Sequence, residues 1–317
     1  MNSQVTTSQD GRVVTVTLSN PPHALMTMEM VAELDVLVRR WETDDSVGAV
    51  IITGSDPVFL SHFDVGTLLQ IAKDSPKLSA SQARVAFRSV RAAARVPGGS
   101  GALGRTSAAG VLELSQFHDL LLRMGRSGVA FIAAINGSTA GGGCEFALAC
   151  DFRLMELGDN EIAQPEIVLG FPPGGGGTQR LARLLGTGRA LELALGADPV
   201  TAERAAEIGL ITKAVPPGEL MNEARTMAER LSRRSKPGIR SVKRAIRDGG
   251  SLPLEQGITV EAGEFLAALT TQEALTLMTA YVGHLEHEGI LPALDPNVRE
   301  QLVDGTFEPI HGESGSG

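Results

Sequence analysis

The sequence predicts an α/β fold that is followed by a helical C-terminal part. Three apolar runs indicate a central sheet: an alternating β-branched run at 13–18 and two continuous runs, at 49–53 and 129–135. Continuous apolar runs of this length are typical of strands that are buried on both faces of a parallel sheet. Beyond residue 217 the apolar spacing is helical and indicates no further strand.

The first two strands are joined by a helix. The strand at 13–18 ends at an Asn-Pro-Pro turn, and from Thr27 to Trp41 apolar residues recur at helical spacing, with Thr27 as the candidate N-cap. The run at 49–53 follows directly. A strand, a helix and a second strand within about 40 residues predict a crossover unit of an α/β fold.

The later elements follow the strand at 129–135. A glycine run at 141–143 separates this strand from a tightly packed helix expected at 144–150, where Cys144 and Cys150 are small apolar residues. The remaining expected elements are a strand at 152–155, short helices at 178–185, 189–195 and 202–208, and C-terminal helices at 219–232, 236–246, 254–269 and 272–284.

The chain is therefore divided into an α/β core at 1–215, a helical part at 216–288 and a polar tail at 289–317, whose last residues are expected to be disordered. An irregular insertion at about 72–110 interrupts the core. Within it Arg84, Arg88, Arg91 and Arg95 are spaced by 4, 3 and 4, so they are predicted to share one face of a helix.

Charge and composition exclude several classes of function. Asp and Glu number 37 against 28 Lys and Arg, and a net charge of -9 argues against a nucleic-acid partner. The two cysteines lack the spacing of a zinc site, and His284 and His287 are expected to be solvated at a polar helix end rather than metal ligands. With no signal segment or membrane-spanning run recognised, we expect a cytoplasmic protein without metal, nicotinamide or membrane contact.

Two segments are candidates for chemistry. Glycines 141–143 followed by Cys144 and Glu145 place unpaired N–H groups at a helix start, which is either an oxyanion site or a tight turn. Pro165 holds Glu166 on an extended or turn segment beside the glycine run at 174–177, which is either a second functional carboxylate or a surface turn. The residues alone leave both choices open.

Residues 130–215 resemble the enoyl-CoA hydratase/isomerase family, the crotonase superfamily, in three successive motifs: IAAINGSTAGGGCEFALACDFRL, AQPEIVLGFPPGGGGTQRLARLLGTGRALEL and ADPVTAERAAEIGLITKAV. The resemblance implies a crotonase-like spiral of ββα units and a helical C-terminal part that forms trimers, often paired into hexamers. It also implies an acyl-CoA substrate and no cofactor other than the coenzyme A of that substrate.

The family stabilises a thioester oxyanion with two backbone N–H groups, which the resemblance places at Phe63 and Gly142. The first lies in the segment FLSHFD, where the family usually has F-x-A-G-A-D, so His62 and Phe63 replace small residues. The other residues that the resemblance places at the substrate are His62, Asp64, Gly141, Pro165 and Gly174.

The resemblance also assigns the two glutamates, Glu145 as the base that activates water and Glu166 as the acid. Adding water across a conjugated double bond requires these two functions. Retention of both favours an enoyl-CoA hydratase that performs syn addition to a 2-enoyl-CoA. The alternatives are an enoyl-CoA isomerase or another crotonase-type reaction, or a catalytically weak acyl-CoA-binding oligomer in which His62 and Phe63 impair the first donor.

The binding of the coenzyme A phosphates is left open. The family usually places Lys or Arg near the first oxyanion segment, and residues 55–70 contain neither. The arginine face of the insertion is a substitute candidate, and a solvated helix face is the plainer alternative. We expect the insertion to cap the acyl pocket and to select the substrate.

Overall fold

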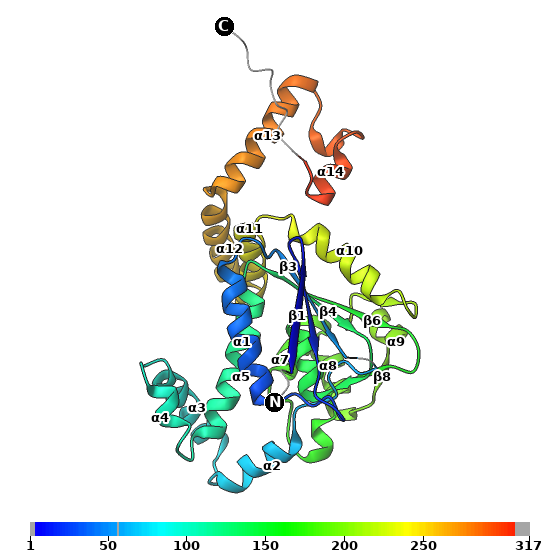
Figure 1. Ribbon diagram of the computed structural model, residues 1–317. Helices are drawn as coiled ribbons and strands as arrows, with labels where there is room; N and C mark the ends of the chain where they lie inside the picture. The colour runs from blue at the N-terminus through cyan, green and yellow to red at the C-terminus, as the bar shows by residue number, and fades with distance from the viewer. Residues whose placement is uncertain (1–3, 56, 308–317) are drawn as a thin grey trace.

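The computed structural model describes residues 4–55 and 57–307, which are arranged around a six-stranded sheet (Figure 1). The strand order is β1-β2-β3-β4-β6-β9, and only the β1–β2 pair is antiparallel. The strands are β1 (Val5–Asp10), β2 (Val13–Leu18), β3 (Ala49–Gly54), β4 (Ala130–Ile135), β6 (Phe152–Glu156) and β9 (Lys213–Val215). The predicted α/β class is therefore confirmed.

Helix α1 (Met28–Thr43) connects β2 to its parallel neighbour β3, as the predicted crossover requires. The side chain of Thr27 accepts a hydrogen bond from the N–H of Met30, so it is the N-cap. The apolar face of α1, including Leu34 and Trp41, is buried against the sheet. The local sequence was sufficient to predict α1, because the N-cap residue and the apolar spacing both indicate a helix that begins after Thr27.

The centre of the sheet, formed by β3 and β4, is buried on both faces. Every residue of β3 and β4 is buried, with Val50 and Ile52 in one core cluster and Ala49 and Ile51 in the other. Helix α10 (Leu220–Ser232) covers the second face with small residues such as Ala224. This double cover explains why the two strands are continuously apolar.

A smaller sheet carries the segments that form the site. Its order is β5-β7-β8, with β5 (Thr139–Ala140), β7 (Glu161–Ala163) and β8 (Val200–Thr201). The adjoining helices are α6 (Gly141–Ala149), η1 (Glu166–Leu169), α7 (Gly177–Leu185), α8 (Thr187–Gly196) and α9 (Ala202–Glu207). Helix α6 begins at Gly141 rather than at 144 as expected, and all of its residues are buried.

The insertion is helical rather than irregular. It follows α2 (Val65–Asp74) and comprises α3 (Ala80–Ala94) and α4 (Gly99–Leu103), and α5 (Ala109–Arg126) comes next. Helix α3 lies against α5 (Figure 1). The rings of Phe87 and His118 are 5.5 Å apart, and Arg91 forms an ion pair with Asp119. The insertion therefore supports α5 from outside.

Beyond α10, the C-terminal part is helical and extends away from the sheet (Figure 1). It contains α11 (Lys236–Arg244), η2 (Ala245–Gly249), α12 (Leu254–Leu269) and α13 (Gln272–Glu288). No residue of α12 is buried, and large apolar side chains are exposed on both long helices: Leu254, Ile258, Phe265, Leu266, Leu275, Leu277, Met278 and Val282.

The segment expected to be a polar tail contains η3 (Pro292–Leu294) and α14 (Arg299–Asp304). His284 is buried rather than solvated, because its Nε2 lies 3.0 Å from Asp295 Oδ2 and its ring lies 6.0 Å from the ring of Phe307. His287 is exposed, as expected. The expected disorder at the extreme C-terminus lies outside the described residues.

Candidate active site

The predicted site residues meet in one cavity of about 520 Å³. They come from the loop between β3 and α2, the start of α6, the start of η1 and the loop before α7. The predicted residues that line this cavity are His62, Phe63, Gly141, Gly142, Glu145, Pro165, Glu166 and Gly174. Segments about 110 residues apart in sequence are thus brought together by the fold.

Asp64 is the one predicted substrate contact that does not line this cavity. Its carboxylate caps α2 by accepting hydrogen bonds from Thr67 Oγ1 (2.7 Å) and the N–H of Gly66 (2.9 Å). The hydrogen bond from Thr67, more than that from Gly66, lowers the pKa of Asp64 against the effect of desolvation. Asp64 therefore fixes the helix start that follows the first oxyanion segment.

The two expected oxyanion donors lie side by side. A Cβ built on Gly142 would be 2.9 Å from Phe63 Cβ and 3.2 Å from its backbone nitrogen, so only glycine fits at 142. The N–H of Gly142 belongs to the first turn of α6, where helical acceptors are missing. The N–H of Phe63 donates to no group within the described chain. Both donors are therefore free to meet an anion.

The first oxyanion segment keeps its shape despite the two bulky residues. Met26 on the neighbouring segment donates its N–H to the carbonyl of His62 and accepts from the N–H of Asp64. The imidazole of His62 donates from Nδ1 to the carbonyl of Phe63 (2.8 Å), and the Phe63 ring packs against Phe117, with 5.9 Å between ring centroids. Both side chains form cavity wall and leave the amide free.

Glu145 is almost completely buried, and both of its carboxylate oxygens are held by backbone. They accept hydrogen bonds from the N–H groups of Gly175 (2.8 Å) and Gly177 (2.7 Å). Burial, assisted by the charge of Glu166, raises the pKa of Glu145 to about 7, although these two bonds oppose the shift. A carboxyl with this pKa can accept and return a proton near neutral pH.

The carboxylate of Glu145 approaches the backbone of the glycine run at 174–177 so closely that side chains would not fit there. A Cβ on Gly175 would lie 2.6 Å from Glu145 Oε2, and one on Gly177 would lie 3.0 Å from Oε1. Arg180 holds the loop from the other side, since its Nη1 donates to the carbonyl of Gly175 (2.8 Å). The run is therefore a carboxylate cradle rather than a phosphate loop.

Glu166 stands at the start of η1 and is 8% exposed. Its Oε2 is buried and has no hydrogen-bond partner in the described chain, while Oε1 lies 3.4 Å from the Cβ position of Gly141. Burial raises the pKa of Glu166. A carboxyl group without a stabilising partner favours its protonated form, which is the state that a proton donor needs.

The apolar wall of the cavity was not predicted from the sequence. It is formed by one face of α2 and one face of α5, together with residues after Glu166. The apolar spacing of both helices was visible in the sequence, but periodicity does not say what each face covers. The wall residues missed by the sequence analysis are Met28, Val65, Leu68, Ile71, Gly110, Glu113, Leu114, Phe117, Val168, Leu169 and Phe171.

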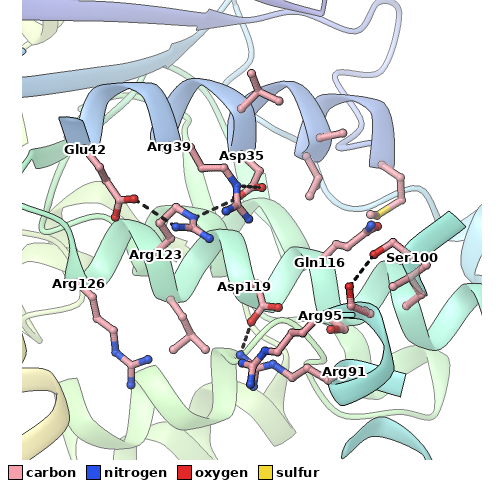
Figure 2. Close-up of a pocket in the computed structure, with 18 of the residues that line it drawn as sticks. Asp35, Arg39, Glu42, Arg91, Arg95, Ser100, Gln116, Asp119, Arg123 and Arg126 are labelled. Carbon is pink, nitrogen blue, oxygen red and sulfur yellow. Dashed lines mark hydrogen bonds and ion pairs between the residues drawn. The ribbon is translucent and has the colours of Figure 1, made fainter. Parts of the chain in front are cut away.

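The arginine face does not reach this cavity. Only Arg91 and Arg95 line a second cavity, of about 740 Å³, between α1, α3 and α5, whereas Arg84 and Arg88 are exposed elsewhere on α3. Figure 2 shows Arg123 paired with Asp35 and Glu42, Arg39 with Asp35, and Arg91 with Asp119. These pairs reduce the positive charge that the cavity could offer to phosphates.

The two cavities have only Met28 in common. Of the predicted insertion at about 72–110, Gly110 at its C-terminal end lines the active-site cavity and the residues before it do not. The insertion therefore borders the acyl pocket at one residue and does not cap it as expected. Within residues 4–55 and 57–307 there is also no helix long and apolar enough to cross a membrane. The same ranges contain no cluster of three or more His, Cys, Asp or Glu arranged for a metal ion.

The fold and the site define a class of protein: an α/β protein that combines two free backbone N–H donors and two buried carboxyl groups in one largely apolar cavity. Comparison with known proteins identifies the family within this class. A model of the enoyl-CoA hydratase/isomerase family matches residues 103–288. A probable mitochondrial enoyl-CoA hydratase of Dictyostelium discoideum is 34% identical over 280 residues, which cover 87% of this chain and 87% of the relative.

Two further comparisons agree. A short-chain-enoyl-CoA hydratase of Clostridium acetobutylicum is 30% identical over 90% of this chain and 97% of the relative. The crystal structure of an enoyl-CoA hydratase from Bacillus anthracis matches with a TM-score of 0.70 at 25% identity, covering 88% of this chain and 96% of that one. The chain belongs to the enoyl-CoA hydratase/isomerase family, and the predicted crotonase-like fold is confirmed.

Proposed function

We propose that this protein is an enoyl-CoA hydratase that adds water syn to the double bond of a 2-enoyl-CoA. The observation that carries the proposal is the presence of both Glu145 and Glu166, buried in the same cavity as the two free N–H donors. The relatives described as hydratases support the same assignment. No cofactor is required beyond the coenzyme A moiety of the substrate.

The geometry supports a simple division of roles. The N–H groups of Phe63 and Gly142 bind the thioester oxygen and stabilise the negative charge that develops on it. Glu145, as carboxylate, accepts a proton from the water that attacks carbon 3. Glu166, as carboxylic acid, gives its proton to carbon 2. The two carboxyl groups exchange protonation states during the reaction, so the assignment describes the pair in the direction of hydration.

The direct test is the loss of the enoyl-thioester absorbance when crotonyl-CoA is added to the wild-type chain. We expect turnover by the wild-type protein and strong loss in Glu145→Gln and in Glu166→Gln. Hydration without dependence on either glutamate would contradict the mechanism. Binding of crotonyl-CoA without turnover would favour the weak acyl-CoA-binding alternative.

The isomerase alternative is separated by a different substrate. A 3-enoyl-CoA requires proton transfer between carbons 2 and 4 and no water. A protein that converts 3-enoyl-CoA faster than it hydrates 2-enoyl-CoA would be an isomerase. The hydrogen bonds that direct Glu145 into the cavity favour hydration, because a second carboxylate is available to activate water.

We further propose that the chain forms trimers or hexamers in the cytoplasm. The exposed apolar side chains of α12 and α13, including Phe265 and Leu277, support an assembly that covers them. The two free cysteines fit a reducing compartment. Sedimentation should show three or six times the chain mass of 33.2 kDa. A stable monomer would contradict the assembly.

A further inference from the structure

The acyl part of the cavity is a slot between two helices. Val65, Leu68 and Ile71 line it from α2, and their spacing of three places them on one face of that helix. Helix α5 lines it with a face formed by Gly110, Glu113, Leu114 and Phe117. Helix α2 begins two residues after Phe63, with Asp64 as its N-cap, so the slot starts next to the oxyanion donors.

One end of the slot is the catalytic end. The Phe117 ring touches the Phe63 ring, with 5.9 Å between centroids. Phe117 also occupies the space in front of Gly175, whose N–H holds Glu145. Phe117 therefore marks the level at which carbons 2 and 3 of the substrate must lie.

The other end is closed by a contact between the two helices. A Cβ on Gly110 would overlap the side chain of Ile71, so the glycine allows the helices to meet there. Gly110 and Phe117 are seven residues apart on α5, which corresponds to about 10 Å of helix and to about eight extended carbon atoms. The slot thus suits a medium-chain acyl group and excludes a long one.

A carboxylate stands inside this slot. Glu113 lies about one helical turn from Phe117 toward the closed end, roughly the level of carbon 8 of the acyl chain. It is half-buried and makes no hydrogen bond or ion pair within the described chain. Desolvation, and then the nearby charge of Glu29, raises the pKa of Glu113. An apolar chain that passes this group must remove water from it without replacing the lost hydrogen bonds.

We propose that Glu113 is a specificity-determining residue that selects a medium-chain 2-enoyl-CoA with a hydroxyl group at the far end of its acyl chain, near carbon 8. The hydroxyl group donates a hydrogen bond to the Glu113 carboxylate. This bond replaces a hydrogen bond with water that the carboxylate loses when the acyl chain binds. Because it names the substrate class of the same site, the inference rests on the proposed hydratase function.

The test compares 2-octenoyl-CoA with 8-hydroxy-2-octenoyl-CoA as substrates of the full chain. For the wild-type protein we expect kcat/KM to favour the hydroxylated substrate by roughly ten- to a hundredfold. Glu113→Leu should reverse the preference, and Glu113→Gln should keep part of it because the amide oxygen still accepts. Leu114→Ala, one residue away in the same wall, is the matched control and should leave the ratio between the two substrates unchanged.

Different results would overturn the role of Glu113 and the proposed hydratase function. If the wild-type protein hydrates crotonyl-CoA but does not prefer the hydroxylated substrate, or if Glu113→Leu keeps that preference, the role of Glu113 is overturned. If no enoyl-CoA is hydrated, the proposed function fails. Calorimetry with octanoyl-CoA and 8-hydroxyoctanoyl-CoA then tests Glu113 without turnover, because equal affinities in the wild-type protein would overturn its role and the expected difference would support it.

Discussion

The catalytic end and the acyl end of the cavity are built on different principles. The catalytic end uses backbone N–H groups and buried carboxyls, held by glycines that no other residue could replace without overlap. The acyl end uses side chains on α2 and α5, where α2 has no buried residue. The chemistry therefore depends on a rigid interior, whereas the selection of the acyl chain depends on helices that tolerate substitution.

The largest expected effect is the removal of either catalytic carboxyl. Glu145→Gln and Glu166→Gln should each lower kcat for crotonyl-CoA by about 10²- to 10⁴-fold with a small change in KM, because proton transfer and not binding is lost. Steady-state kinetics measures this. Glu203→Gln on the exposed start of α9 is the matched control. A loss that occurs only in KM would show that the glutamates bind rather than catalyse.

The next largest effect is expected at the oxyanion donors. Gly142→Ala would press a methyl group against Phe63 and separate the two N–H groups, so kcat should fall by about 10- to 10³-fold. Gly188→Ala in α8 has open space around the new methyl group and serves as control. If Gly142→Ala keeps full activity while its melting temperature is unchanged, the oxyanion assignment is wrong.

Changing the closed end of the slot should have a moderate effect on selection alone. Ile71→Ala removes the side chain that meets Gly110, so the kcat/KM for 2-dodecenoyl-CoA relative to crotonyl-CoA should rise by roughly tenfold. Kinetics over a chain-length series measures the shift. Val85→Ala on the exposed face of α3 should leave the series unchanged. A general loss of activity for every chain length would place Ile71 in the support of the catalytic end instead.

The smallest expected effect is a gradual one with pH. Glu145 must be ionised to accept a proton, and its pKa is about 7, so kcat/KM should be about fivefold lower at pH 6 than at pH 7 and should level off above that value. Glu166 must be protonated, and the rate should fall at higher pH as this carboxyl ionises. A pH profile with crotonyl-CoA checks both limbs. An acid limb near the ordinary carboxyl pKa would contradict the burial argument.

Several parts of the structure could be predicted locally. Thr27 as a cap and the helix that follows it, the buried strands β3 and β4, and the order of the C-terminal helices all depend on residues close in sequence. The family motifs also indicated Glu145 and Glu166 as a pair. The predicted helices and strands are confirmed because capping, periodicity and turn chemistry act over a few residues.

Other features were decided by the tertiary structure. The sequence alone allowed Asp64 at the substrate, His284 in solvent and the insertion over the pocket, whereas the fold makes Asp64 a helix cap, buries His284 and places α3 behind α5. The face of α5 that carries Glu113 also became a slot wall only because α2 lies opposite. Sequence by itself determined the elements and the chemical groups, but which groups meet depends on long-range packing, since periodicity specifies a buried face and not its neighbour.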